Sequence, residues 1–368
     1  MSLFFAQNYV FIKAWCYRVL SFFTYEKILF IDELLNKEVQ SDFIFKKSSD
    51  KSLMKDFQDS DSMITELEKK QNTPLTFSDE ERQIAVEFFK YHNYYSFGIY
   101  RKLLPRREEK TYSFTECLTL YQFDTYLREN INKFTGVVEL MFRATLVQQL
   151  CEAYKGDLHK GEFYLDYEIY NSESNANEVL EAFNKRMLSS KSDSAIHHIK
   201  NKEGRIPFWV IVEEATFGEL YHFLTVLKSD YLEQWVANSF NKQYRKHFSS
   251  WIRTTNFMRN TCAHYSRIYG RYFSGSPPKL LKEDLKKAGI KANANQTLFA
   301  NMLAIKNIIK FNPLVIDEWN DFLEDIEVKI SENESLIKLY RMGYPENWRE
   351  CLTISISDQL TIPAYQPF

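Results

Sequence analysis

An arginine and a histidine five positions apart give this chain its clearest candidate for chemistry, within RNTCAHYSRIYGR at residues 259–271. A histidine titrates near neutral pH, so His264 can accept or donate a proton. An arginine stays charged and offers a planar fork of hydrogen-bond donors, so Arg259 can stabilise negative charge on a phosphate. The residue types therefore suit cleavage of an RNA backbone.

Cleavage through the neighbouring 2′-hydroxyl needs one proton taken from that oxygen and one given to the leaving oxygen, and a histidine can do either job. The charge that develops on the phosphorane needs a fixed donor, which an arginine supplies. Such a reaction leaves a 2′,3′-cyclic phosphate and a 5′-hydroxyl. It requires no cofactor and no metal ion, and no acidic cluster with metal-ligand spacing lies beside the segment.

Spacing alone favours a simpler interpretation, in which Arg259 is a surface charge and His264 a hydrogen-bonded core histidine. On a regular helix, residues five apart point about 140° from each other, so this pair does not share a face, whereas Asn260 and His264 do. The pair can serve one phosphate only if the helix begins or bends near Arg259, or if a second copy of the chain completes the cleft.

The composition indicates which elements must position these residues. Glycine and proline are scarce in the 368 residues, with ten and nine copies, and this favours long helices joined by short connections. There is no repeated unit and no alternation of strand and helix, so we predict an all-α fold. A formal net charge of −2 provides no global field for nucleic acid, so a polyanion must be met by a local basic patch.

Helical periodicity is strongest over residues 114–153, where apolar residues recur at three- and four-residue steps. Ser113 and Glu116 form a capping box at its start, and Gly136 predicts a kink or a close helix crossing. A second capping box, at Ser78 and Glu81, predicts the start of another helix. Further helices are predicted at 176–188, 206–227, 244–269, 296–311 and 313–330. The apolar stretch 206–227 is expected to hold the deepest helix.

We divide the chain into an aromatic helical extension at 1–40, a polar linker at 41–62, a helical domain at 63–355 and a C-terminal tail at 356–368. No run approaches the roughly 20 apolar residues of a membrane span, and the N-terminus lacks the pattern of a secretion signal. We expect the extension to pack on its own protein or on a partner, with a membrane-interface helix as the alternative. Five dispersed cysteines without a CxxC pair are typical of buried, reduced thiols in a cytosolic protein.

The segment RNTCAHYSRIYGR resembles the signature of the Abi family of bacterial phage-resistance proteins, and it fits the R-(N/H/K)-x3-H motif of HEPN-type RNases. Four further stretches are similar to blocks of the Abi family, in the family's order: NYYSFGIYRKLL at 93–104, LYQFDTYLRENI to VELMFRATLVQQL at 120–150, IPFWVIVEEATFGEL at 206–220 and YRMGYPENWRE at 340–350. The likeness covers roughly residues 50–352, and the first 40 residues have no counterpart in it.

The resemblance implies an all-α, HEPN-like helical bundle with additional helices, which acts as a toxin or abortive-infection effector and cleaves RNA. It assigns His264 as the acid/base, Arg259 as the phosphate-stabilising donor and Asn260 as a residue that orients one of them or caps the helix. HEPN proteins with one motif usually form homodimers in which two Arg/His pairs meet in one cleft, and this chain has a single R-x4-H motif. Some Abi proteins are paired with a small noncoding RNA that restrains them, so the resemblance predicts RNA both as substrate and as regulatory partner.

Several other residues are candidates for RNA binding. Arg267 and Arg271, at i and i+4, can hold phosphates beside the pair, with solvated charge as the alternative. Arg128 and Arg143 we interpret first as ion-pair partners of residues four positions earlier, Asp124 and Glu139, and second as RNA contacts. The best separate basic patch comprises Arg101, Lys102, Arg106, Arg107 and Lys110. Five tyrosines could stack on bases, although core packing is expected for most of them: Tyr94, Tyr95, Tyr100, Tyr265 and Tyr269.

A metal-independent endoribonuclease is therefore the function that the sequence favours, and two alternatives stay open. One is a non-catalytic RNA-binding or scaffold protein of a phage-defence or toxin–antitoxin system, which would use the same basic cleft. The other is a membrane-acting effector that works through the aromatic N-terminus.

Overall fold

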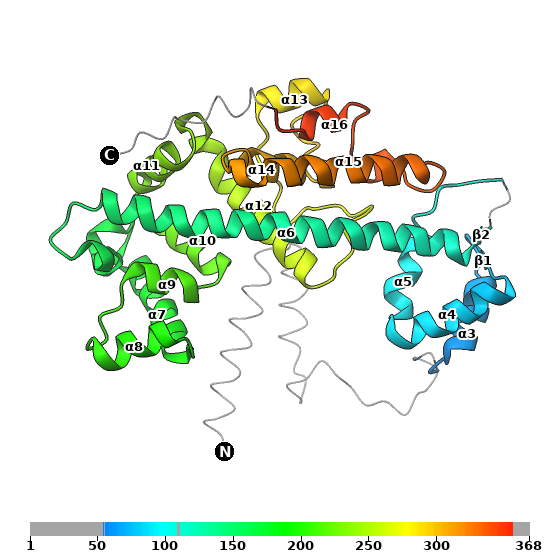
Figure 1. Ribbon diagram of the computed structural model, residues 1–368, viewed down its shortest axis with the longest axis horizontal. Coiled ribbons are helices and arrows are strands. Elements are labelled where there is room, and N and C mark those ends of the chain that lie inside the picture. The colour runs from blue at the N-terminus through cyan, green and yellow to red at the C-terminus, as the bar shows by residue number, and fades with distance from the viewer. Residues whose placement is uncertain (1–53, 55, 109–110, 356–368) are drawn as a thin grey trace, which may run out of the picture. The chain divides into compact units, whose positions relative to one another are not determined.

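The computed structural model describes residue 54 and residues 56–108 and 111–355 (Figure 1). The predicted extension at 1–40, most of the predicted linker at 41–62, Lys110 and the tail at 356–368 lie outside the described residues. The chain divides into two units, Met1–Met63 and Ile64–Phe368, and the following description concerns the second. The last residues of the predicted linker, from Ser60 onward, belong to a helix, α3 (Ser60–Glu68).

The all-α prediction is confirmed. The described part of the chain contains two strands of two residues each, β1 (Leu75–Thr76) and β2 (Tyr112–Ser113), which pair in parallel. The remaining regular structure is helical, with 3-10 turns between many of the helices. The α-helices after α3 are α4 (Asp79–Tyr91), α5 (Tyr94–Arg101), α6 (Phe114–Ala153), α7 (Glu173–Ser189), α8 (Asp193–Asn201), α9 (Phe208–Glu214), α10 (Phe217–Val226), α11 (Ser229–Ser239), α12 (Arg245–Ala263), α13 (Lys282–Ala288), α14 (Leu298–Ile309), α15 (Ile316–Glu332) and α16 (Trp348–Leu352).

Helix α6, 40 residues long, is the element on which the others are assembled. Its N-terminus carries the predicted capping box, in which the Ser113 hydroxyl accepts from the Glu116 amide and the Glu116 carboxylate accepts from the Ser113 amide. Buried apolar residues occur along its whole length, and α6 contacts α5, α9, α11, α12, α14 and α15 (Figure 1). The prediction that Gly136 marks a close helix crossing is wrong, because no atom from outside this part of α6 lies within 4 Å of the position that a Cβ would take; the helix assignment is continuous through Gly136.

The deepest helix is α14, in which all twelve residues are buried, and not a helix over 206–227 as predicted. The stretch 206–227 forms two shorter helices, α9 and α10, which are separated at Ala215 and Thr216. Thr216 is the N-cap of α10 and forms a capping box with Glu219, so the hydrogen bonds of a new helix start at this point.

The cysteines of the described segments are unpaired thiols. Cys117, Cys262 and Cys351 are buried, as expected, whereas Cys151 is only half-buried, and Cys16 lies outside the described residues. Burial raises the pKa of the Cys262 thiol to about 12. Among the helices that the structure describes, none has the length and apolar character needed to cross a membrane.

Candidate active site at the end of helix α12

Helix α12 carries Arg259 and Asn260 in its last turns. The helix is positioned by its apolar side, where Phe248, Trp251 and Met258 are buried. This side packs against α6 and α14, and so fixes the direction of the helix relative to the core. Because α12 is anchored along its length, its C-terminal end is a rigid platform for the polar side chains that leave it.

The helix ends immediately before His264, which is its C-cap residue. The Tyr265 amide donates to the Cys262 carbonyl at 2.9 Å, and the Ser266 amide donates to the Thr261 carbonyl at 3.0 Å. These two bonds form a Schellman motif, in which the residue after the C-cap adopts the left-handed conformation. That residue is Tyr265, with φ of +52°, where a glycine is usually found. The His264 side chain is exposed at this turn, so the alternative of a core histidine is not what the structure has.

The guanidinium of Arg259 is bonded to neighbouring side chains and is also partly exposed to solvent. Its Nε lies 3.4 Å from a carboxylate oxygen of Glu139 on α6, and its Nη1 donates to the side-chain oxygen of Asn260 at 3.3 Å. Glu139 also accepts from Nη2 of Arg143 at 2.6 Å, so one carboxylate joins both arginines. The Arg259 side chain is nonetheless 43% exposed, which leaves part of its guanidinium accessible to a ligand.

Arg259 lies in the last turns of α12, and His264 follows the last residue of this helix as its C-cap. Helix α12 neither begins nor is interrupted at Arg259, because it is continuous from Arg245 to Ala263. Of the two ways in which the pair could serve one phosphate, a helix that begins or bends near Arg259 is therefore not found. The remaining possibility is that a second copy of the chain completes the cleft.

The loop that follows His264 is fastened to α6 by one buried carboxylate. Asp124, which is fully buried, accepts from the backbone amides of Ile268 and Tyr269 at 2.9 and 2.5 Å. The same carboxylate accepts from the Tyr100 hydroxyl at 2.5 Å and from the Arg128 guanidinium at 2.7 Å. A carboxylate with four donors, one of them the Arg128 cation, is well satisfied, so it fixes the loop firmly.

Arg267 and Arg271 lie in this loop, and both side chains donate hydrogen bonds to backbone carbonyls of the loop itself. Arg267 Nη1 donates to the Tyr269 carbonyl, and Arg271 Nη1 donates weakly to the Arg267 carbonyl at 3.5 Å. The Arg271 guanidinium also lies 5.9 and 5.7 Å from the ring centres of Phe257 and Phe273. Burial, and then the charge of Arg267, lower the pKa of Arg271. Within the described residues, no carboxylate forms an ion pair with either arginine, so two cations without ion-pair partners follow His264.

Two arginines that we considered as RNA contacts form ion pairs instead, as first interpreted. Arg128 is buried and paired with Asp124. Arg143 is almost buried, is paired with Glu139, and also donates to the Val212 carbonyl. The expectation that these guanidinium groups bind RNA is not supported by their position, because both terminal nitrogens of each one already donate to protein acceptors.

Only some of the cations of the predicted basic patch at 101–110 are exposed on the surface. Lys102 and Arg106 are exposed. Arg107 is half-buried, donates to Glu116 at 2.6 Å and lies 3.6 Å from the centre of the Tyr112 ring. Arg101 is buried, and burial lowers its pKa. The structure therefore corrects the expectation for Arg101 and Arg107, whose charges are largely used within the protein.

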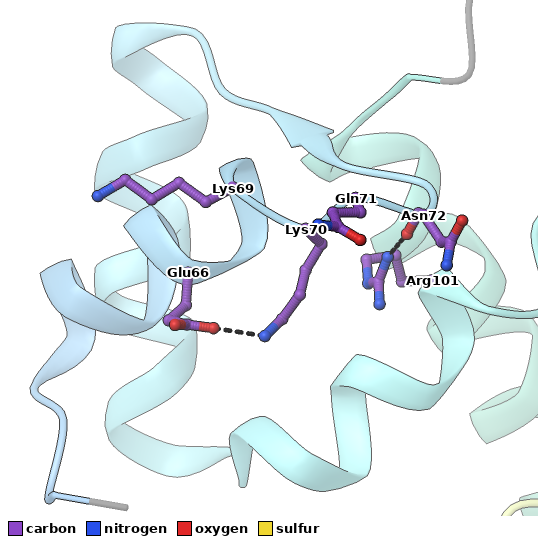
Figure 2. A pocket seen from close by; sticks show the side chains of 6 residues that line it. All are labelled: Glu66, Lys69, Lys70, Gln71, Asn72 and Arg101. Carbon is purple, nitrogen blue, oxygen red and sulfur yellow. Dashed lines mark hydrogen bonds and ion pairs between the residues drawn. The ribbon is translucent and has the colours of Figure 1, made fainter.

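Arg101 faces an open pocket beside the loop that follows α3 (Figure 2). Its guanidinium donates to the backbone carbonyls of Asn72 and Thr73. Lys70, which also lines the pocket, is turned toward Glu66 and forms an ion pair with it. Two of the cations that line the pocket, Arg101 and Lys70, are thus already bonded, and the pocket contains no residue of the 259–271 segment.

Two contacts of the site have no signal in the spacing of residues along the chain. One joins Glu139 to Arg259, and the other joins Asp124 to the amides of Ile268 and Tyr269. Both Asp124 and Glu139 lie in the block at 120–150 that resembles the Abi family, and this is the only hint that the sequence contained.

Comparison with family models gives one match that bears on this site. A model described as Abi-like protein matches residues 87–270, which is half of the chain and includes α6, α12 and the segment with Arg259 and His264. The stretch at 340–350 that resembles the last family block lies outside the matched residues. No curated protein and no solved structure matches the chain.

Proposed function

The chain belongs to the Abi-like protein family, and we propose that it is an abortive-infection effector that acts in phage defence by cleaving RNA. The activity we propose is that of a metal-independent, HEPN-type endoribonuclease. The observation that carries the proposal is the exposed imidazole of His264 at the end of α12, in one short segment with a half-open Arg259 and two arginines without ion-pair partners in the described residues. Family membership by itself supports the defence role, and the chemistry is inferred from the residues.

The proposed reaction follows from the properties of these side chains. An imidazole removes the proton of the 2′-hydroxyl, whose oxygen attacks the adjacent phosphorus, and the 5′-oxygen leaves with a proton from an imidazolium. The guanidinium of Arg259 stabilises the negative charge on the phosphorus oxygens. The products are a 2′,3′-cyclic phosphate and a 5′-hydroxyl. Arg267 and Arg271 hold the neighbouring phosphates.

We further propose that the active form is a homodimer. Residues five positions apart on an unbroken helix point about 140° from each other, whereas a twofold arrangement allows the arginine of one copy to meet the histidine of the other. Co-expression of an Arg259→Ala chain with a His264→Ala chain tests this, because a mixed dimer retains one arginine and one histidine in the shared cleft. We expect each variant to be inactive alone and the mixture to recover part of the activity. Mixed dimers without any activity would contradict the composite cleft.

The second candidate function is a non-catalytic RNA-binding protein, and the presence of Arg267 and Arg271 without ion-pair partners in the described residues favours it. A His264→Ala variant separates the two. If the protein is an RNase, this variant loses cleavage and toxicity but still binds RNA. If the protein only binds RNA, the variant's toxicity and RNA binding change little.

Matched controls are available for this experiment. His197→Ala removes an exposed histidine of α8, and Arg253→Ala removes an exposed arginine of α12 that lies before the motif. Both controls should cleave like the unmodified protein, while His264→Ala and Arg259→Ala should lose at least about 100-fold in rate. Equal cleavage by His264→Ala would refute the assignment of the imidazole.

A small noncoding RNA that restrains the protein is the partner we propose. Sequencing of the RNA that copurifies with the His264→Ala variant identifies it, because this variant should bind the RNA without cutting it. A single abundant species is expected, and an unselective sample of cellular RNA would count against a dedicated regulator.

A further inference from the structure

Tyr265 occupies a position that a tyrosine rarely takes. It is the residue after the C-cap of α12, and its φ of +52° lies in the left-handed region. Side chains with a Cβ are disfavoured there, and glycine is the usual occupant of this position in a Schellman motif. The turn would therefore form at least as well without the ring, so the fold does not explain why a large aromatic residue is present.

The Tyr265 ring is also without a partner in the part of the chain that the structure describes. The residue is 79% exposed, and no ring contact or hydrogen bond involves its side chain. Tyr269 and Tyr100, by contrast, are buried. Tyr95 is exposed to a similar extent, but its ring packs against Tyr94 with centres 5.4 Å apart. Tyr265 is thus an aromatic surface held in the open, directly after His264.

The charges around Tyr265 indicate what this surface contacts. Arg267 and Arg271 follow within the same loop, and neither forms an ion pair among the described residues. A polyanion that carries aromatic groups next to its charges can pair with both arginines and stack on the Tyr265 ring. Single-stranded nucleic acid has this composition, because each phosphate is followed by a base that can stack on an aromatic side chain.

We propose that Tyr265 forms a nucleobase subsite beside His264, on which an unpaired base next to the scissile phosphate stacks. The inference rests on the proposed RNase function and deepens it, because a base must leave a duplex to reach the ring. Tyr265 would then select single-stranded RNA and position the linkage that His264 attacks. The unfavourable backbone conformation is retained because it directs the ring outward at this point.

The central test compares four chains on a mixed-sequence single-stranded RNA oligonucleotide with mapped cleavage positions. Tyr265→Phe keeps the ring and should retain most of the activity that Tyr265→Gly loses. Tyr265→Gly removes the ring and relieves the backbone, so its Tm should rise by about 1 to 3 °C while kcat/KM falls at least about fivefold. Tyr91→Ala, a control that removes a tyrosine 82% exposed on α4, should cleave normally.

A second substrate distinguishes stacking from an indirect effect on the turn. The base next to the mapped cleavage position is replaced by an abasic site. The unmodified protein should lose about the same factor as Tyr265→Gly does on the intact RNA, and Tyr265→Gly should lose nothing further. Independent, multiplicative losses would overturn the subsite, as would full activity of Tyr265→Gly.

The same variants test the base-stacking subsite independently of the proposed RNase reaction. If the unmodified protein binds the oligonucleotide but does not cleave it, the RNase proposal fails, and affinity for the intact and abasic RNA takes the place of kcat/KM. If Tyr265→Gly changes the oligomeric state and leaves RNA affinity unchanged, the ring packs on a second copy and the subsite is refuted.

Discussion

The carboxylate of Glu139 on α6 lies 3.4 Å from Nε of Arg259 on α12. A contact through Nε leaves the terminal amino groups of the guanidinium to face outward, one of them toward Asn260. Because Glu139 shares its charge with Arg143, it fixes the orientation of Arg259 without fully neutralising its positive charge. We infer that Glu139 is a positioning residue for the proposed reaction.

Glu139→Gln tests this role. The amide cannot accept from both arginines as strongly as the carboxylate, so Arg259 gains freedom, and we expect kcat to fall about tenfold with little change in KM. Glu129→Gln is the control, since Glu129 is an exposed residue of the same helix. Steady-state cleavage rates decide the question. A rise in kcat would contradict positioning and would mean that Glu139 restrains Arg259.

Asp124 should be essential for stability as well as for the site. Asp124→Ala leaves the buried Arg128 guanidinium and the amides of Ile268 and Tyr269 without their acceptor. We expect the free energy of unfolding to fall by about 3 to 5 kcal/mol in a urea titration. Tyr100→Phe removes one donor of the same carboxylate and should cost only about 1 kcal/mol. Equal losses for the two variants would contradict the central place of the carboxylate.

The parts of the fold that sequence predicts are those with local signals. The capping box at Ser113 and the apolar stripe after it define α6, because both depend on residues within a few positions of each other. The division of 206–227 also had a local signal, Thr216 followed by Glu219. It was outweighed by the continuous apolar run, which hides the start of a second helix.

The site was predictable as a set of residue types but not as an arrangement. The pair Arg259 and His264 follows from its chemistry and from a family resemblance. Its supports, Glu139 and Asp124, come from packing of α6 against α12 and the following loop, and tertiary contacts of this kind leave no periodic trace in a sequence. The end of α12 was also missed, since a tyrosine takes the place of the glycine that would mark it.

Gly343 lies in the stretch at 340–350, and its substitution should be among the most damaging. Its φ is +70°, and an added Cβ would lie 2.4 Å from Cβ of Thr297, the N-cap of α14. Gly343→Ala is expected to lower the free energy of unfolding by about 2 to 4 kcal/mol. Gly136→Ala, on the open side of α6, should instead raise it by about 0.5 to 1 kcal/mol. Denaturant titrations measure both, and a neutral Gly343→Ala would contradict the close approach.

Cys262 should take no part in the chemistry despite its place inside the R-x4-H motif. Burial raises its pKa to about 12 from the ordinary value of 9.0, so the folded protein at pH 8 has about a thousandfold less thiolate than the unfolded chain. Since the folded pKa is the higher one, this thiol lowers stability only as the pH rises above about 9. Iodoacetamide at pH 8 should therefore leave native activity intact and label Cys262 after unfolding. Rapid inactivation of the native protein would contradict this.

The end groups of the cleaved RNA test the central claim most directly. The purified protein is incubated with a single-stranded RNA in EDTA, in parallel with His264→Ala and with a substrate that carries a 2′-deoxy sugar at the mapped cleavage position. The account predicts 2′,3′-cyclic phosphate and 5′-hydroxyl ends in EDTA, and no cleavage by the variant or of the deoxy linkage. Products with 3′-hydroxyl and 5′-phosphate ends, or cleavage that persists without the imidazole or the 2′-hydroxyl, would contradict it.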